Sequence, residues 1–195
     1  AMAIERKRAE QMQQSIYRVS EAAHAARNLE ELSRLIHQIV AELLPAHNFG
    51  IVLYDAATDM LHFPYFVDER RSQAPPPRRP GHGLAEYVLH TGRSLLCDAA
   101  KFAEMKQAGD VDDKEMESMI WLGVPLIVEK KTIGVMGLHD YTQGKAYGKQ
   151  EQFILEYVSS QVAKEIEKKR VEEGLRLFRH TMESISELVS ITDTN

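Results

Sequence analysis

The 195-residue sequence contains a single cysteine, Cys97, a single tryptophan, and no strong excess of either charge. A lone cysteine cannot form an intrachain disulfide, so the chain does not require an oxidising compartment, and we expect a cytoplasmic protein. The formal net charge of −5 gives no general attraction to a polyanion, which argues against nucleic acid as a partner. No uncharged apolar run approaches the roughly 20 residues that a membrane-spanning helix needs.

Sequence signatures of metal binding and phosphate binding are also missing. Four histidines are candidate metal ligands, but none has the close paired spacing of a zinc or haem-attachment motif: His62, His82, His90 and His139. No glycine-rich loop ends in Lys-Ser or Lys-Thr, the pattern that cradles a nucleotide phosphate. We therefore expect no metal site and no catalytic residues, and any cofactor is unknown.

The N-terminal region has a strongly helical composition, with no glycine or proline between Ile4 and Leu44. Asn28, followed by two glutamates, predicts the N-cap of a second helix and therefore a break near Arg27. Apolar residues spaced by four and three, typical of a narrow helix–helix seam, precede this break: Met12, Ile16, Val19, Ala23 and Ala26. We interpret this seam as intermolecular and the wider apolar face of residues 29–43 as core-facing.

Apolar residues that alternate with period two predict five strands, at 49–54, 61–67, 94–97, 120–128 and 132–139. The last two are apolar on both faces, so we expect them in the middle of the sheet. Residues 68–82 contain four prolines, which predict a long exposed loop. Residues 83–90 are expected to form a short helix that Gly92 ends, and the acidic segment 98–118 a solvated helix and loop.

A second long helix is predicted from Lys149 onward. Its expected core-facing residues are Phe153, Ile154, Tyr157, Val158, Val162 and Ile166. Around and beyond Gly174 the spacing by four and three returns, at Val171, Leu175, Phe178, Met182, Ile185 and Val189. The order of these predicted helices and strands along the chain indicates an α+β fold. In this fold, helices flank a central sheet of about five or six strands, and long coiled-coil-like helices form both termini.

Several separated segments resemble the GAF domain family, in the order in which the family has them. Residues 121–128 (WLGVPLIV) and 132–138 (TIGVMGL) are similar to the paired central strands, and residues 81–96 to the helix and strand that precede them. Residues 63–69 add to the resemblance, which covers about 28–167. It implies an antiparallel sheet and a sensory module of bacterial signalling proteins, with a small-molecule cavity between the sheet and the loops over it.

Residues 175–195 resemble the first helix and first strand of a PAS domain. This resemblance implies that the chain is an excerpt from a larger receptor, similar to the input halves of sensor histidine kinases and diguanylate cyclases. His180 lies where a histidine kinase could carry its phosphoacceptor, but its neighbours Arg179 and Thr181 are not the acidic residues expected there. We interpret His180 as a surface histidine.

Aromatic and polar side chains alternate along the strands that the resemblance places below the cavity. We interpret six of them as candidate ligand-binding residues, for each of which the alternative is a plain core position: Phe63, Tyr65, Tyr87, Cys97, Trp121 and His139. A slip of one residue in strand register would replace Phe63 and Tyr65 by His62 and Phe66.

Two kinds of ligand known from GAF domains are not expected. Bilin-carrying relatives often have a Cys-His pair, whereas Cys97 stands between Leu96 and Asp98, so we interpret it as a buried core thiol. The Asn-Lys…Phe…Asp-Glu signature of members that bind cyclic nucleotides is absent, because asparagine occurs only at positions 28, 48 and 195.

Three functional hypotheses follow. The first is a non-catalytic sensory GAF domain at 28–167 that binds an unknown small molecule and forms a homodimer through its terminal helices. The full-length protein that we favour for it is a sensor histidine kinase. Residues 1–27 would be a signalling helix, and 168–195 a linker helix and the truncated start of a PAS domain that leads to an output domain. The second is a ligand-free dimerising spacer, or the input domain of a diguanylate cyclase. The third, a GAF-fold methionine sulfoxide reductase, needs resolving cysteines that this chain lacks.

Overall fold

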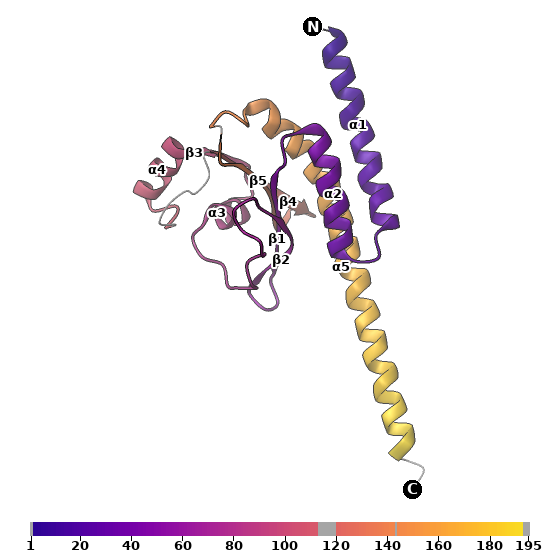
Figure 1. The fold of residues 1–195 in the computed structure, drawn as a ribbon. Helices are drawn as coiled ribbons and strands as arrows, with labels where there is room; N and C mark the ends of the chain where they lie inside the picture. The colour runs from indigo at the N-terminus through magenta and orange to yellow at the C-terminus, as the bar shows by residue number, and fades with distance from the viewer. Residues whose placement is uncertain (1, 113–119, 143, 193–195) are drawn as a thin grey trace.

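The structure, a computed structural model, describes the backbone of residues 2–112, 120–142 and 144–192 (Figure 1). Its centre is a five-stranded sheet in the order β2-β1-β5-β4-β3, in which every neighbouring pair is antiparallel. The strands are β1 (Asn48–Asp55), β2 (Met60–Val67), β3 (Leu95–Asp98), β4 (Ile120–Val128) and β5 (Lys131–Asp140). The predicted α+β fold is confirmed, and β4 and β5 lie inside the sheet as expected.

Helices cover both faces of this sheet. In the described part of the chain they are α1 (Met2–Ala25), α2 (Leu29–Leu43), α3 (Leu84–Thr91), α4 (Ala99–Ala108) and α5 (Lys149–Thr192). Figure 1 shows α1, α2 and α5 side by side on one face, with α3 and α4 on the other side of the sheet. The N-terminal end of α1 and the C-terminal part of α5 extend past the sheet in opposite directions. None of the helices within these residues is long and apolar enough to span a membrane.

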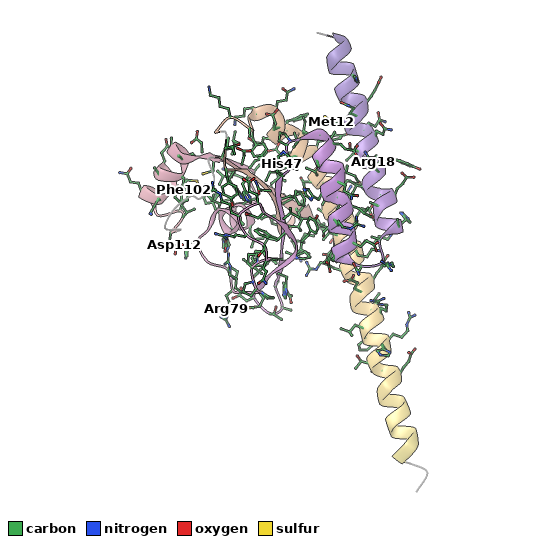
Figure 2. The ribbon with its side chains drawn as sticks, viewed as in Figure 1. Met12, Arg18, His47, Arg79, Phe102 and Asp112 are labelled. Atoms are coloured by element: carbon green, nitrogen blue, oxygen red, sulfur yellow. The ribbon has the colours of Figure 1, made fainter. Side chains whose placement is uncertain are left out.

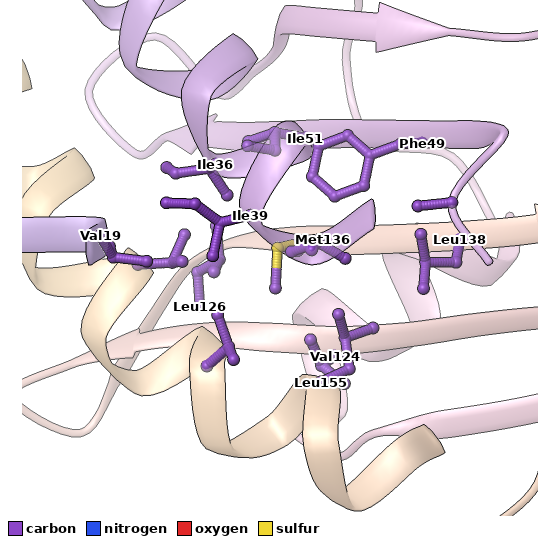
Figure 3. Packing of buried hydrophobic residues seen from close by; sticks show 14 of the residues in the cluster. Val19, Ile36, Ile39, Phe49, Ile51, Val124, Leu126, Met136, Leu138 and Leu155 are labelled. Atoms are coloured by element: carbon purple, nitrogen blue, oxygen red, sulfur yellow. The ribbon is translucent and has the colours of Figure 1, made fainter. Parts of the chain in front are cut away.

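The larger hydrophobic core lies between the sheet and helices α2 and α5. Alternate residues of β1, β4 and β5 enter it and are completely or almost completely buried: Phe49, Ile51, Leu122, Leu126, Met136 and Leu138. Figure 3 shows side chains of this set meeting Ile36 and Ile39 from α2 and Leu155 from α5. Complete burial of a residue such as Leu122 contributes about 1.5–3 kcal/mol relative to exposure, so this face of the sheet supplies much of the stability.

The turn between α1 and α2 occurs where the sequence predicts it. Asn28 is the N-cap of α2, and its side chain accepts a hydrogen bond from the backbone N–H of Glu31 at 2.8 Å. The turn brings α1 back beside α2, and Arg18 Nη2 of α1 donates to Glu42 Oε1 of α2 at 2.8 Å (Figure 2 labels Arg18). The pairing of the two helices is therefore intramolecular.

The predicted intermolecular use of the α1 seam is wrong. Val19, Ala23 and Ala26 are 0%, 6% and 4% exposed, and they pack in the core that α1 shares with α2 and α5 of the same chain. Met12 and Ile16, nearer the N-terminus, are only partly buried. A spacing by four and three indicates that a helix packs along one stripe, and the partner here belongs to the same chain.

Helix α5 differs from its prediction in two ways. Phe153 and Tyr157, expected to face the core, are 60% and 40% exposed, whereas the core-facing residues are Leu155, Val158, Val162, Ala163 and Ile166. The helix is also continuous through Gly174 to Thr192, so no strand of the kind that the PAS resemblance implies forms up to that residue. Residues 193–195, and the side chains of Ile185 and Val189, lie outside the described part.

The acidic segment 98–118 is less solvated than predicted. Phe102 and Met105 on α4, and Val111 after it, are 7%, 3% and 2% exposed and belong to a second hydrophobic cluster (Figure 2 labels Phe102). This cluster lies on the face of the sheet opposite to α2 and α5. Residues 113–118 of the segment lie outside the described residues.

Candidate ligand-binding site

Three glycines lie side by side across the face of the sheet that is turned away from α2 and α5. Gly137 of β5 pairs with Gly50 of β1 on one side and with Gly123 of β4 on the other. Because glycine has no side chain, this row leaves room for side chains of neighbouring residues to lie over the centre of the sheet. The indole ring of Trp121 lies over Gly123, where an added Cβ would come within 1.9 Å of the ring carbon Cη2. Gly123 is therefore required for the position of the Trp121 ring.

An extra residue in β2 decides which of its side chains face the glycine row. Two β1 residues that are two apart pair with Tyr65 and His62, which are three apart, so β2 contains a bulge. Pro64, which has no backbone N–H, lies in this irregular part of an edge strand, where proline is tolerated. Consequently Phe63 and Phe66 face the same side, and Tyr65 faces the other.

A cavity of about 120 Å³ lies over the glycine row. Besides Gly50 and Gly137, its walls are Val52, Phe63, Phe66, Ala85, Trp121, Val135 and His139. Apolar and aromatic walls with few polar groups are the usual composition of a small-molecule site. Two larger grooves beside α5, of about 810 and 720 Å³, are open to solvent and have the charged side chain of Glu173 in their walls. The small cavity is therefore the better candidate for an apolar ligand.

Asp68, the first residue after β2, forms a hydrogen bond with His139, a polar side chain in the wall of this cavity. Its side chain is 2% exposed, and its Oδ2 lies 2.8 Å from both Tyr141 Oη and His139 Nε2. Its Oδ1 accepts hydrogen bonds from the backbone N–H groups of Arg70 and Arg71, at 2.7 and 2.9 Å. Burial raises the pKa of Asp68, but these four hydrogen bonds outweigh it and hold the pKa below its ordinary value.

The ionised Asp68 decides which nitrogen of His139 carries hydrogen. A carboxylate only accepts hydrogen bonds, so His139 Nε2 must be the donor, and Nδ1 of the neutral ring is then an acceptor. Within the described part of the chain, Nδ1 has no hydrogen-bond partner. With its ring neutral, His139 therefore offers an unused acceptor to a molecule in the cavity.

The loop 68–82 contacts Phe63, one wall of the cavity, through Arg78. Arg78 forms an isolated antiparallel bridge with Leu61 of β2, with N···O distances of 2.7 and 3.1 Å. Its guanidinium also pairs with Glu86 of α3 at 2.5 Å, although the Glu86 side chain is only 3% exposed. The carbon of the guanidinium lies 5.7 Å from the centre of the Phe63 ring. The loop is exposed, as predicted, but Arg78 joins it to both β2 and α3.

Three of the six residues proposed from the sequence line the cavity: Phe63, Trp121 and His139. Tyr87 and Cys97 pack in the hydrophobic cluster on the same side of the sheet, without lining the cavity. The placement of Tyr65 in this site is wrong. Its hydroxyl lies 3.0 Å from His37 Nδ1 on the helix-covered face, because the bulge reverses the alternation of β2.

Cys97 is a core thiol, as the sequence indicated. It is completely buried, and burial raises its pKa to about 11. The group is therefore a protonated thiol at neutral pH and a poor nucleophile.

The sequence did not predict the glycine row or most of the residues that line the cavity. Gly50 and Gly137 carried no signal of their own, because their alignment depends on the pairing of β1 with β5. The alternation of β2 places Phe66 on this side only after a shift in register, and Pro64 is the one local sign that β2 is irregular. Asp68 carries no local signal, since its contact with His139 joins residues far apart in the chain.

Comparison with known proteins identifies the family to which this fold belongs. A family profile described as GAF domain matches residues 26–167, which is more than half of the chain. No curated protein sequence matches the chain. The GAF domain of a phosphoenolpyruvate-protein phosphotransferase from Acinetobacter is similar in structure, with a TM-score of 0.64 and 14% sequence identity over 84% of this chain and 97% of that one.

Two further solved structures show the same fold. Free methionine-R-sulfoxide reductase from Neisseria meningitidis has a TM-score of 0.63 and 15% identity, over 83% of this chain and 91% of that one. A segment of a methyl-accepting chemotaxis protein has a TM-score of 0.63 and 14% identity, over 78% of this chain and 97% of that one. At these identities the similarity establishes the fold alone.

Proposed function

This chain belongs to the GAF domain family, a regulatory and sensory fold, and we propose that it is the non-catalytic sensory domain of a multidomain signal-transduction protein. A small molecule binds in the cavity over the glycine row, and the terminal helices carry the resulting change toward a PAS domain and an output domain. A sensor histidine kinase is the output that we favour. The observation that carries this proposal is the cavity on strands whose other face packs on α5.

The strands provide a short path from the cavity to the helices. Gly137 and His139 line the cavity, while Met136 and Leu138, which alternate with them along β5, are buried in the core on the helix-covered face. A ligand that shifts β5 therefore changes the packing of the helices directly. It favours one arrangement only by its difference in affinity for the two arrangements.

Helix α5 is joined to the turn between α1 and α2 by two charged side chains. Lys169 Nζ donates to the carbonyl oxygen of Ala26, at the end of α1, at 3.0 Å. One turn further along, Glu173 Oε1 accepts from the backbone N–H of Leu29, at the start of α2, at 2.7 Å. Each charge matches the dipole of the helix end that it contacts. These contacts favour movement of α1, α2 and α5 as one unit.

We further propose that the protein is a homodimer, through the part of α5 that extends past the sheet. Four apolar residues spaced by four and three are 51–65% exposed there: Val171, Leu175, Phe178 and Met182. This is the spacing of a coiled coil, and an identical helix of a second copy has the same period and can cover the stripe along its whole length.

The catalytic alternative has little support in the residues. The sulfoxide reductase shares the fold with this chain, but such chemistry needs a thiolate and a resolving partner. Cys97 is the single cysteine, is buried, and has a raised pKa. A ligand-free dimerising spacer, or the input domain of a diguanylate cyclase, remains the alternative function.

Native mass spectrometry of the freshly purified protein tests this proposal. We expect a dimer that carries a discrete additional mass. A bare dimer would favour the spacer function, and a bare monomer would contradict the relay through dimeric helices. Phe178→Glu should give a monomer, whereas Leu177→Glu, 68% exposed but outside the stripe, is the matched control and should remain dimeric.

A further inference from the structure

The volume of the cavity matches about one aromatic ring. Its volume is about 120 Å³, whereas an engineered apolar cavity of roughly 150 Å³ in another protein binds benzene. A nucleotide or a peptide side chain with a long polar tail is too large for this space. The side chains of Phe63, Phe66 and Trp121 surround it, and aromatic rings pack on one another edge to face or with an offset.

Gly50 and Gly137 place backbone, rather than side chains, in the wall of the cavity. The Phe66 ring lies close to Gly50, with Cδ2 3.4 Å from where a Cβ would be, so a bound ring contacts the backbone of β1 and β5 only between the aromatic side chains. A Cβ added at Gly137 would already lie 3.4 Å from the Trp121 ring. Even one methyl group here would therefore remove part of the space.

The polar groups of the cavity are one acceptor and one donor. Nδ1 of His139 is the acceptor, because the contact with Asp68 uses Nε2. The indole N–H of Trp121 is the donor, and among the described residues no group accepts a hydrogen bond from it. Trp121 and His139 are paired across β4 and β5, so donor and acceptor come from neighbouring positions.

The charges around the cavity favour a neutral ligand. None of the lining residues is a lysine or arginine, so a bound anion would lose its hydration without a compensating charge. A cation finds no carboxylate among the lining residues, and the carboxylate that contacts His139, that of Asp68, is already used by four hydrogen bonds.

We infer that the cavity binds a small neutral aromatic molecule with a hydroxyl group, a ligand of the phenol class. The ring lies beside Gly50 and Gly137 between the aromatic walls, and the hydroxyl donates to His139 Nδ1 and accepts from the indole N–H of Trp121. A hydroxyl is suited to this pair because it is both donor and acceptor. This inference rests on the proposed sensory function, since it names the class of molecule that the same cavity detects.

Titration with phenol and toluene tests the inference, because the two molecules have nearly the same shape and differ in the hydroxyl. Calorimetry measures both affinities at pH 8. Fluorescence of Trp121, the only tryptophan of the chain, reports whether each compound enters the cavity. We expect phenol to bind about tenfold more tightly than toluene, which corresponds to about 1.4 kcal/mol, and to change the Trp121 emission.

The variant His139→Phe should reduce the preference for phenol to about twofold or less while toluene still binds. His62→Phe makes the same change at an exposed histidine outside the cavity and should keep the full preference. Equal binding of phenol and toluene to the unaltered protein would overturn the phenol-class inference and leave the sensory proposal intact. If neither compound binds but xenon enters the cavity, as measured by ¹²⁹Xe NMR, the inference is likewise wrong. Exclusion of xenon as well would contradict the cavity itself and the proposed function with it.

Discussion

The two faces of the sheet are made by the same strands but are packed in different ways. On the face toward α2 and α5, large aliphatic and aromatic side chains such as Leu122 and Met136 are completely buried. On the opposite face, Gly50, Gly123 and Gly137 have no side chains, and a cavity of about 120 Å³ lies there. The first face provides stability and the second provides room for a ligand. Since side chains alternate along a strand, one strand can serve both purposes.

This difference explains how a small ligand can influence long helices without contacting them. Side chains around the cavity can move when a ligand binds, because the space beside them is empty. The helix-covered core is close-packed, so a displacement of the strands also displaces the helices. His139 and Leu138 are neighbours in β5, one at the cavity and one in the core. Three predictions test this contrast between a filled face and an open face.

The largest effect is expected from a charge placed in the filled core. Val19→Asp introduces a carboxylate at a completely buried position of α1, and should cost more than about 4 kcal/mol of unfolding free energy or prevent folding. Urea denaturation measures this change. Tyr17→Asp, at a residue of the same helix that is 65% exposed, is the control and should change stability by less than about 0.5 kcal/mol. Normal stability of Val19→Asp together with loss of the dimer would instead support an intermolecular α1 seam.

A smaller effect is expected from one methyl group added on each face of β5. In Gly134→Ala the new Cβ would lie 2.3 Å from the backbone oxygen of Val52, so we expect a loss of about 1–3 kcal/mol, typical of overpacking. In Gly137→Ala it would lie 3.4 Å from the Trp121 ring, an ordinary contact, and stability should change by less than about 1 kcal/mol. Denaturation curves for the two variants give the comparison. Equal losses would show that the cavity-facing side is as tightly packed as the other.

An effect no larger than that of Gly134→Ala, but dependent on pH, is expected at Asp68, on the rim of the open face. Its pKa is lower in the folded protein, so its contribution to stability is present at neutral pH and is lost as the pH falls through and below the ordinary value of about 3.9. Asp68→Asn should lose about 1–3 kcal/mol at pH 7, because its hydrogen bonds no longer involve a charged acceptor. Its stability should also decline less steeply toward acid pH than that of the unaltered protein.

Thermal unfolding between pH 7 and pH 3 measures this dependence. Asp110→Asn, at an exposed position after α4, removes one carboxylate elsewhere and should leave the acid-induced decline as it is in the unaltered protein. An Asp68→Asn curve parallel to that of the unaltered protein would contradict the role of Asp68 in the network.

The sequence predicted the elements of this fold more completely than the surfaces that they form. Each of the five strands lies within a few residues of its predicted range, and the break before α2 occurs at the predicted cap, Asn28. The core-facing side of α5 was predicted less well, because Phe153 and Tyr157 are as apolar as the residues that are buried. Hydrophobicity indicates that a residue can be buried, but only the position of the neighbouring elements decides whether it is.

The candidate site shows the same limit. Trp121, Phe63 and His139 were predicted because unusual residue types stood at alternating positions in the strands. Tyr65 was misplaced by a single extra residue in β2, which reversed the alternation after Pro64. Asp68 was missed because its importance comes from its contact with His139 across the fold.

The sequence by itself determined, to within a few residues, where the five strands and helices α2 and α3 begin and end. Asn28 caps α2, Gly92 ends α3 with a φ of +61°, and the prolines of residues 68–82 exclude regular structure, since each of these effects depends on a few adjacent residues. The tertiary structure alone decided that α1 packs on its own chain and that Gly50, Gly123 and Gly137 form one row. These outcomes depend on contacts between residues far apart in the chain, which local preferences do not specify.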